Sequence, residues 1–207
     1  MAISTYAELK TSIADFLNRD DIDDVIPTFI SLAEAGFNRD IRHYSMESRQ
    51  TASTDERFLT RPSDWLETIR INLVGSGTST IELMSAHSMQ DARQASSDTA
   101  GTPAYYAHVD GNFELFPSPN ASVDIELLYF AKIPALSDSN TSNWLLSQYP
   151  DLYLYASLAH TAPYLQEDAR IPIWTTLYKE LIETMNNESD SAKWSGTGLK
   201  PKIRGLG

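Results

Sequence analysis

Hydrophobic residues recur at helical spacing over residues 5–42. Leu9, Ile13 and Leu17 share one face of a segment that opens with Thr5 and Glu8, which have the spacing of a capping box. A second segment carries an apolar stripe that ends near Arg42; its members are Ile26, Phe29, Ile30, Ala33, Phe37 and Ile41. Because neither segment can bury its stripe alone, the pattern predicts two helices packed as a hairpin.

The period of the hydrophobic pattern changes from 3.6 to 2 between residues 46 and 133. Alternation around residues 69–73, 80–83 and 122–133 predicts strands. Between AYYAHV and NFELF, Asp110 and Gly111 both tolerate positive φ, which predicts a hairpin with a type I′ turn. A short helix near residues 88–95, capped by Ser88, is expected to interrupt the strands. The segment therefore predicts a small antiparallel sandwich or barrel.

Some of these predicted strands carry apolar residues on a second face. These residues are Leu128 and Phe130 on the long strand and Tyr106 and Phe116 on the hairpin. Because monomeric proteins rarely expose large apolar patches, a covering helix or a partner protein is expected there.

Helical spacing returns after residue 133. One helix is expected to start near Pro150 and to end at or before Pro163. A longer helix is expected from about Asp168 to Trp194, and its apolar stripe places Trp174 in the core.

The whole pattern predicts an α+β fold with four parts. A helical bundle is formed by the N- and C-terminal helices, over residues 1–45 and 134–194. A small antiparallel β domain, residues 46–133, is inserted between its halves, which is feasible because the ends of a compact domain often lie close together. Residues 195–207 form an extended C-terminal tail.

The tail, SGTGLKPKIRGLG, differs in composition from the rest of the chain. It holds four of the nine glycines and one proline, which keep it from continuing the helix. Three bases with no acid to offset them alternate with three apolar anchors. These six residues are Leu199, Lys200, Lys202, Ile203, Arg204 and Leu206. The tail is either a frayed terminus or a basic arm that orders in a groove of a partner.

Charge and composition exclude several classes of function. The 207 residues include 28 acids and 16 bases, a net charge of −12, so a broad phosphate-binding surface of Lys and Arg is excluded. The lack of cysteine excludes a disulfide framework, thiolate zinc ligands and a cysteine nucleophile. The start MAISTYAELK does not resemble a signal peptide, and no apolar run approaches 18 residues. A soluble acidic protein made in the cytoplasm is expected.

Motifs for catalysis are missing from the sequence. It contains no GxSxG, no Walker loop, no GxGxxG and no HExxH. The four histidines are scattered without metal-ligand spacing: His43, His87, His108 and His160. The sequence therefore predicts no enzyme activity, no cofactor and no metal.

Two groups of acids are candidate sites. The first is Asp20, Asp21, Asp23 and Asp24. It lacks the Gly and the closing Glu of a calcium loop, so it is interpreted as a solvated turn that caps a helix. Asp124 and Glu126 share a strand face but have no clear acid/base partner, so they are interpreted as surface residues rather than a glycosidase pair.

Four segments resemble, in the same order, segments of the head-to-tail adaptor proteins of short-tailed bacteriophages. They are TYAELKTSIADFLNRDDIDDVIPTFISLAEAGFNRDIR, RPSDWLETIRINL, GNFELFPSP…VDIELLYFAKIPALSD, and NWLLSQYPDLYLYASLAHTAPYL with the Trp-bearing helix that follows it. Each segment is mostly a core pattern, and the order of the segments is the specific feature. The chain is similar to this family over nearly all of its length.

This resemblance implies a structural virion protein, of the kind also called head-completion, upper tail tube or gatekeeper proteins. It implies a helical bundle with a β domain and a twelve-fold ring docked beneath the portal protein, with a C-terminal arm that enters the portal. The tail matches that arm in position and character, so its six basic and apolar residues are expected to bind the portal. The other expected partners are further copies of the chain, the tail nozzle protein and tail fibres; no membrane is expected.

The charge of the chain agrees with passage of genome DNA through such a ring without specific binding. Without the three tail bases, the chain has 13 bases and 28 acids, which gives a net charge of −15 per copy. Repeated around a ring, this charge would repel the phosphates of DNA in the channel. Two alternatives stay open. One is a β-rich receptor- or carbohydrate-binding tail protein, which needs exposed aromatic rings around the β domain. The other is a hydrolase whose site is assembled from scattered residues.

Overall fold

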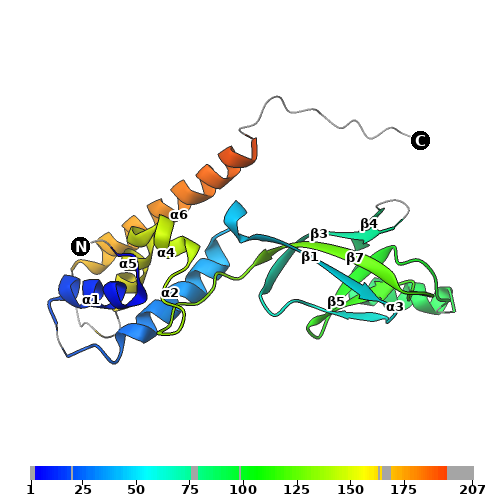
Figure 1. Cartoon of the computed structure of the whole chain (residues 1–207), viewed down its shortest axis with the longest axis horizontal. Helices are drawn as coiled ribbons and strands as arrows, with labels where there is room; N and C mark the ends of the chain where they lie inside the picture. Colours follow the sequence, from blue (N-terminus) through cyan, green and yellow to red (C-terminus); the bar gives the residue numbers. More distant parts are fainter. Residues whose placement is uncertain are drawn as a thin grey trace. The chain divides into compact units, whose positions relative to one another are not determined.

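The computed structural model describes residues 3–19, 21–75, 79–97, 99–162, 164 and 169–194. These residues form six α-helices and seven strands, which confirms the predicted α+β class. They divide into two compact units (Figure 1): a β unit over Met46–Lys132, and a helical unit made of the described residues on either side of it in the sequence. Within the described part of the chain, no helix is both long and apolar enough to cross a membrane.

Five of the described helices build the helical unit. Their bounds are Tyr6–Leu17 (α1), Ile26–Asp40 (α2), Trp144–Gln148 (α4), Pro150–Ala159 (α5) and Ile171–Trp194 (α6). Helix α5 contacts the other four and buries side chains nearly all round, so it lies at the centre of the unit. The short helix α4, capped by Asn143, was not predicted as a separate element.

Local signals set the ends of these helices. Thr5 and Glu8 form the predicted capping box: Thr5 Oγ1 accepts from the Glu8 N–H at 3.3 Å, and Glu8 Oε2 accepts from the Thr5 N–H at 3.0 Å. Asn18 adopts the left-handed conformation, φ 53°, and ends α1.

Pro150 lies in the first turn of α5, which confirms the predicted start of that helix. Pro27 likewise lies in the first turn of α2, but the N-cap of α2 is Val25 and no side chain caps it. The interpretation of the acidic turn before α2 as a helix cap is therefore wrong.

One seven-stranded sheet, in the order β1-β7-β3-β4-β5-β6-β2, forms the β unit. Its strands are Glu47–Thr54 (β1), Phe58–Thr60 (β2), Trp65–Val74 (β3), Ser79–Leu83 (β4), Tyr105–Val109 (β5), Asn112–Phe116 (β6) and Val123–Ala131 (β7). Five neighbouring pairs are antiparallel, but β4 and β5 are parallel. Because a tight turn cannot join parallel strands, the chain crosses between them through Ala86–Ala95 (α3). The prediction of a purely antiparallel domain is wrong at this pair.

The cap of α3 also differs from the prediction. Ser85 is the cap, and its Oγ accepts from the Ser88 N–H at 3.1 Å. Ser88 was the predicted cap, but Ala86 and His87 already belong to the helix, so Ser88 lies within its first turn. The predicted type I′ hairpin turn is confirmed, since Asp110 and Gly111 have φ of 41° and 76°.

The two faces of the sheet bury different hydrophobic sets. The larger core consists of Ile71, Ile81, Tyr106, Phe113, Leu115, Ile125, Leu127 and Tyr129. On the other face, Met89 of α3 packs against Phe116 and Ala107. The hairpin register pairs Tyr106 with Leu115, and Phe116 with Tyr105. Tyr106 and Phe116 therefore lie on opposite faces, and the prediction that both belong to a second face is wrong.

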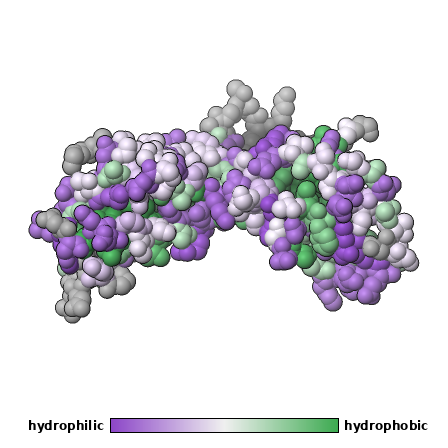
Figure 2. Space-filling view, turned by 60° about the horizontal axis from the view of Figure 1, so that its bottom comes forward, coloured by the Kyte–Doolittle hydropathy of each residue, from purple (hydrophilic) through white to green (hydrophobic). Residues whose placement is uncertain are grey.

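Hydrophobic residues also reach the surface of the β unit. Leu128 and Phe130 are half-buried on β7. Four large hydrophobic residues of the unit are exposed: Phe58, Ile69, Val74 and Leu83. Figure 2 shows hydrophobic residues gathered over part of this unit on one face, with hydrophilic residues around them. Helix α3 therefore supplies the predicted cover only for the Phe116 face.

Candidate functional site

The residues predicted to bind the portal lie outside the described residues. They are Leu199, Lys200, Lys202, Ile203, Arg204 and Leu206. The described helix that leads towards them in the sequence is α6, which ends at Trp194. The candidate site is therefore built from α6 and from the parts of the helical unit that hold it.

Side chains of α6 hold the segment that follows α2. Asn186 Nδ2 donates to the Asp40 carbonyl at 3.2 Å, and Asn186 Oδ1 accepts from the Arg42 N–H at 3.3 Å. Ser189 Oγ accepts from the Tyr44 N–H at 3.0 Å. These bonds pair backbone groups that have no helical partner where α2 ends. The C-terminal half of α6 is thereby fixed to residues 40–44.

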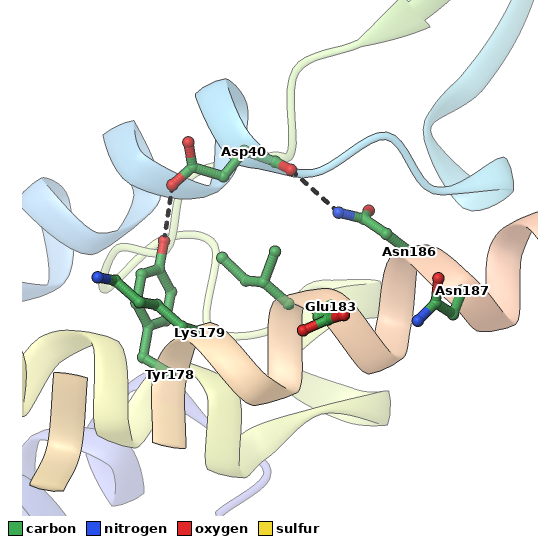
Figure 3. A pocket seen from close by; sticks show the side chains of 7 residues that line it. Asp40, Tyr178, Lys179, Glu183, Asn186 and Asn187 are labelled. Carbon is green, nitrogen blue, oxygen red and sulfur yellow. Dashed lines mark hydrogen bonds between the residues drawn. The ribbon is translucent and has the colours of Figure 1, made fainter. Parts of the chain in front are cut away.

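An open groove of about 390 Å³ lies where α6 passes the end of α2 (Figure 3). It is lined by Asp40, Tyr178, Lys179, Ile182, Glu183, Asn186 and Asn187. The Tyr178 hydroxyl donates to Asp40 Oδ2 at 3.2 Å; burial, and then this carboxylate, raise the pKa of Tyr178 far above its ordinary value. The phenol therefore stays protonated at neutral pH. The lining combines one apolar side chain, Ile182, with two carboxylates, Asp40 and Glu183, and one ammonium group, Lys179.

Helix α2 holds the segment where the chain re-enters the helical unit. Asn38 Oδ1 accepts from the Ile133 N–H at 3.0 Å. Glu34 Oε1 accepts from the Leu136 N–H at 2.7 Å and from the Tyr153 hydroxyl at 3.2 Å. Burial raises the pKa of Glu34, and these two hydrogen bonds oppose the shift. The carboxyl is thus a structural group whose lone pairs face backbone and phenol donors.

His43 is buried in the segment that α6 holds. Its ring stacks on Trp144, with centroids 5.2 Å apart and planes 15° apart, and its Nδ1 accepts from the Ser45 N–H at 3.2 Å. The neutral ring therefore carries its hydrogen on Nε2, which has no hydrogen-bond partner among the described residues. Burial lowers the pKa of His43; Glu188 opposes this shift and Lys193 adds to it. The contacts of His43 are those of a packed core ring.

In the β unit, two arginines hold the buried carboxylate of Glu114. Glu114 Oε1 accepts from Arg57 Nε at 2.9 Å and from Arg93 Nε at 3.0 Å. Arg93 also donates to Ser118 Oγ at 3.0 Å. The cluster joins α3 to β6 and to the residues before β2, and such a buried pair is costly to break. It fastens the helix to the sheet.

Aromatic rings on the β unit bear on the carbohydrate-binding alternative, which needs open ring faces. The Arg61 guanidinium lies 4.4 Å from the Trp65 ring centroid, and Trp65 Nε1 donates to Thr68 Oγ1 at 3.0 Å. The Arg57 guanidinium lies 5.1 Å from the ring centroid of Phe58. At these two rings the structure favours cation–π packing over sugar stacking.

The other three histidines lie on or beside different elements, α3, β5 and α5. His87 and His108 are exposed, and His160 is half-buried at the end of α5. Asp20 lies outside the described residues. Three of the other acids have neighbouring partners: Asp21 with Arg19, Asp124 with Ser53, and Glu126 with Arg49. Across the described ranges, no three His, Cys, Asp or Glu side chains are grouped so that they could hold a metal ion.

Sequence reasoning missed Asn186 and Glu34. Asn186 and Asn187 stand together inside a 24-residue helix, although Asn is a poor helix former that favours caps and turns. Glu34 stands beside Ala33 on the buried face of α2, where a charge needs partners. Both signals are visible in the sequence, but neither names the backbone groups that these side chains bind.

A sequence model described as SU10 adaptor protein matches residues 4–201 of the chain. The match spans both the helical unit and the β unit and agrees with the resemblance found in the order of the segments. A comparison with curated proteins gives no match. The chain belongs to the SU10 adaptor protein family, a family of phage head-tail adaptors.

Proposed function

We propose that the protein forms a ring between the portal and the tail nozzle and completes the channel through which DNA is ejected. The match to the adaptor family over residues 4–201 carries this proposal. Twelve copies form the ring in the virion, after synthesis in the host cytoplasm, and tail fibres are further partners. The role is structural and uses no catalysis, cofactor or metal.

Each part of the chain has its own place in the proposed ring. Residues 1–45 and 134–194 form the helical bundle of the ring, residues 46–133 are the inserted β domain, and residues 195–207 are the arm. The helical and β units of the structure support this division. Without the three tail bases, each copy has a net charge of −15. Acidic residues that line the passage repel the phosphates of DNA.

The arm is the main portal-binding element. Leu199, Ile203 and Leu206 supply apolar anchors, and the three bases between them pair with carboxylates or backbone carbonyls of the portal. Ordering the arm on docking costs conformational entropy, but it lets a short segment reach into a groove between portal subunits. The bonds from Asn186 and Ser189 support this role, because they fix the helix from which the arm starts.

Deletion of residues 199–207 tests the proposal. The melting temperature should stay nearly unchanged, because a terminal arm outside the core of a domain contributes little to its stability. Binding to purified portal rings should fall by orders of magnitude, because every copy in the ring loses its arm.

A matched control separates charge from anchoring. In Lys200→Gln/Lys202→Gln/Arg204→Gln the anchors remain, so binding should weaken mainly at low salt, where charges are least screened. Pull-downs of wild type, the truncation and this variant at low and moderate salt give the comparison. A truncated protein that binds portal as well as wild type would refute the arm's role and leave it a frayed end.

A further inference from the structure

Four residues on the outer face of α6 form a hole of the kind found in knobs-into-holes packing between helices. Ile173, Thr176, Leu177 and Glu180 are spaced i, i+3, i+4 and i+7, the four positions that surround a knob from a facing helix. With Pro172 they line an open groove of about 340 Å³. Ile173 is 58% exposed, so the hole is open among the described residues.

Helix α2 carries a matching knob on its own outer face. Leu32 is 46% exposed, whereas its helical neighbours on the buried side form the apolar stripe of α2. Thr28 and Ala35, at i−4 and i+3, are exposed and short, so Leu32 projects from a low surface. An apolar side chain in that setting is suited to a hole.

We infer that Leu32 of one copy inserts into the hole on α6 of the next copy. The inference rests on the proposed ring and names the surfaces that would build it. Knob and hole lie on different helices. In a ring the contact is head-to-tail, with each copy giving a knob to one neighbour and a hole to the other. Contacts of this type close into rings when the rotation between copies allows it.

Charge fixes the direction of the two helices. Arg39 lies seven residues after Leu32, which is about 10.5 Å further along the same face of α2. With Leu32 at the centre of the hole, α6 of the neighbouring copy can run parallel or antiparallel to α2. The parallel direction brings Glu180 and Glu183 close to Arg39, whereas the antiparallel direction brings Arg170 close to it. Among the described residues, no ion pair within one copy occupies Arg39, Glu180 or Glu183. The parallel arrangement is therefore the complementary one.

The short length of α2 limits the area that the contact can bury. Its 15 residues span about 22 Å, so the seam buries less than the roughly 800 Å² per partner of a standard interface. One such contact is weak. A closed ring on the portal, in which every copy makes two of them, is stabilised by multivalency. The test must therefore trap the contact in assembled rings.

The lack of cysteine in the chain allows a direct trap. Leu32→Cys and Thr176→Cys place single thiols at exposed positions on knob and hole. The two variants are mixed, bound to purified portal rings and oxidised mildly. Disulfide-linked dimers are expected from the mixture and not from either variant alone, and Leu32→Cys/Thr176→Cys should give a ladder of linked copies. Leu32→Cys mixed with Lys179→Cys, an exposed position on another side of α6, is the matched control and should stay unlinked.

The outcomes of this trap separate the interface from the proposed function. Portal-bound protein in which the Leu32→Cys and Thr176→Cys variants do not link overturns the interface while leaving portal binding in place. Links between two Leu32→Cys copies overturn the head-to-tail arrangement. Specific knob-to-hole links in free protein that does not bind portal support the interface and count against the proposed function.

Charge reversal gives an independent check of the direction. Arg39→Glu should lower the yield of the link several-fold, because a carboxylate then faces Glu180 and Glu183. Glu180→Arg/Glu183→Arg in the neighbouring copy should restore the yield. No restoration overturns the parallel direction.

Discussion

Replacing Trp174 by Ala should destabilise the helical unit severely. Trp174 is 5% exposed on α6, which confirms its predicted burial, and the Arg170 guanidinium lies 5.0 Å from its ring centroid. Removing a buried Trp side chain costs about 3–5 kcal/mol. Because a domain is stable by only about 5–15 kcal/mol, this loss is a large fraction of the total and should lead to poor folding.

Urea unfolding followed by helical circular dichroism measures this effect. Ile173→Ala is the matched control, because Ile173 is the adjacent residue on the same helix and is 58% exposed; its free energy of unfolding should change by less than about 0.5 kcal/mol. Trp174→Phe keeps a buried ring and should recover much of the lost stability. If Trp174→Ala unfolds at the same urea concentration as wild type but no longer binds portal, Trp174 belongs to an interface and the core assignment is refuted.

Two further predictions concern pH and catalysis. Burial keeps folded His43 neutral below the ordinary histidine pKa of about 6.5, where the unfolded chain takes up a proton, so stability should fall as pH drops from about 6.5 towards the lowered folded pKa. His43→Phe should therefore lose less unfolding free energy between about pH 8 and pH 5.5 than wild type or the exposed control His87→Gln; equal losses in all three would contradict the burial argument. No glycosidase or peptidase turnover is expected, and a reproducible rate abolished by replacing one of the four histidines, Asp124 or Glu126 would contradict it.

Short-range chemistry made part of this molecule predictable from its sequence. The Thr5–Glu8 capping box joins residues three apart, and the Asp110–Gly111 turn depends only on the backbone freedom of two residues. Helical periodicity likewise placed Trp174 in the core. The composition of the tail singled out a basic arm, whose binding role stays a prediction. The capping box and the turn depend only on residues that are close together in the sequence, and helical periodicity shows which face of α6 is apolar.

The tertiary structure decided the features that join distant residues. The Glu34 carboxylate binds the Leu136 N–H across 102 positions, and the Asn186 side chain binds the Arg42 N–H across 144. The parallel pairing of β4 with β5 and the separation of Tyr106 from Phe116 follow from strand order and register. A polar residue on an otherwise apolar helix face indicates in the sequence that a buried group will need a hydrogen-bond partner. Which backbone group fills that need depends on how whole helices and strands pack, and packing is a property of the folded chain as a whole.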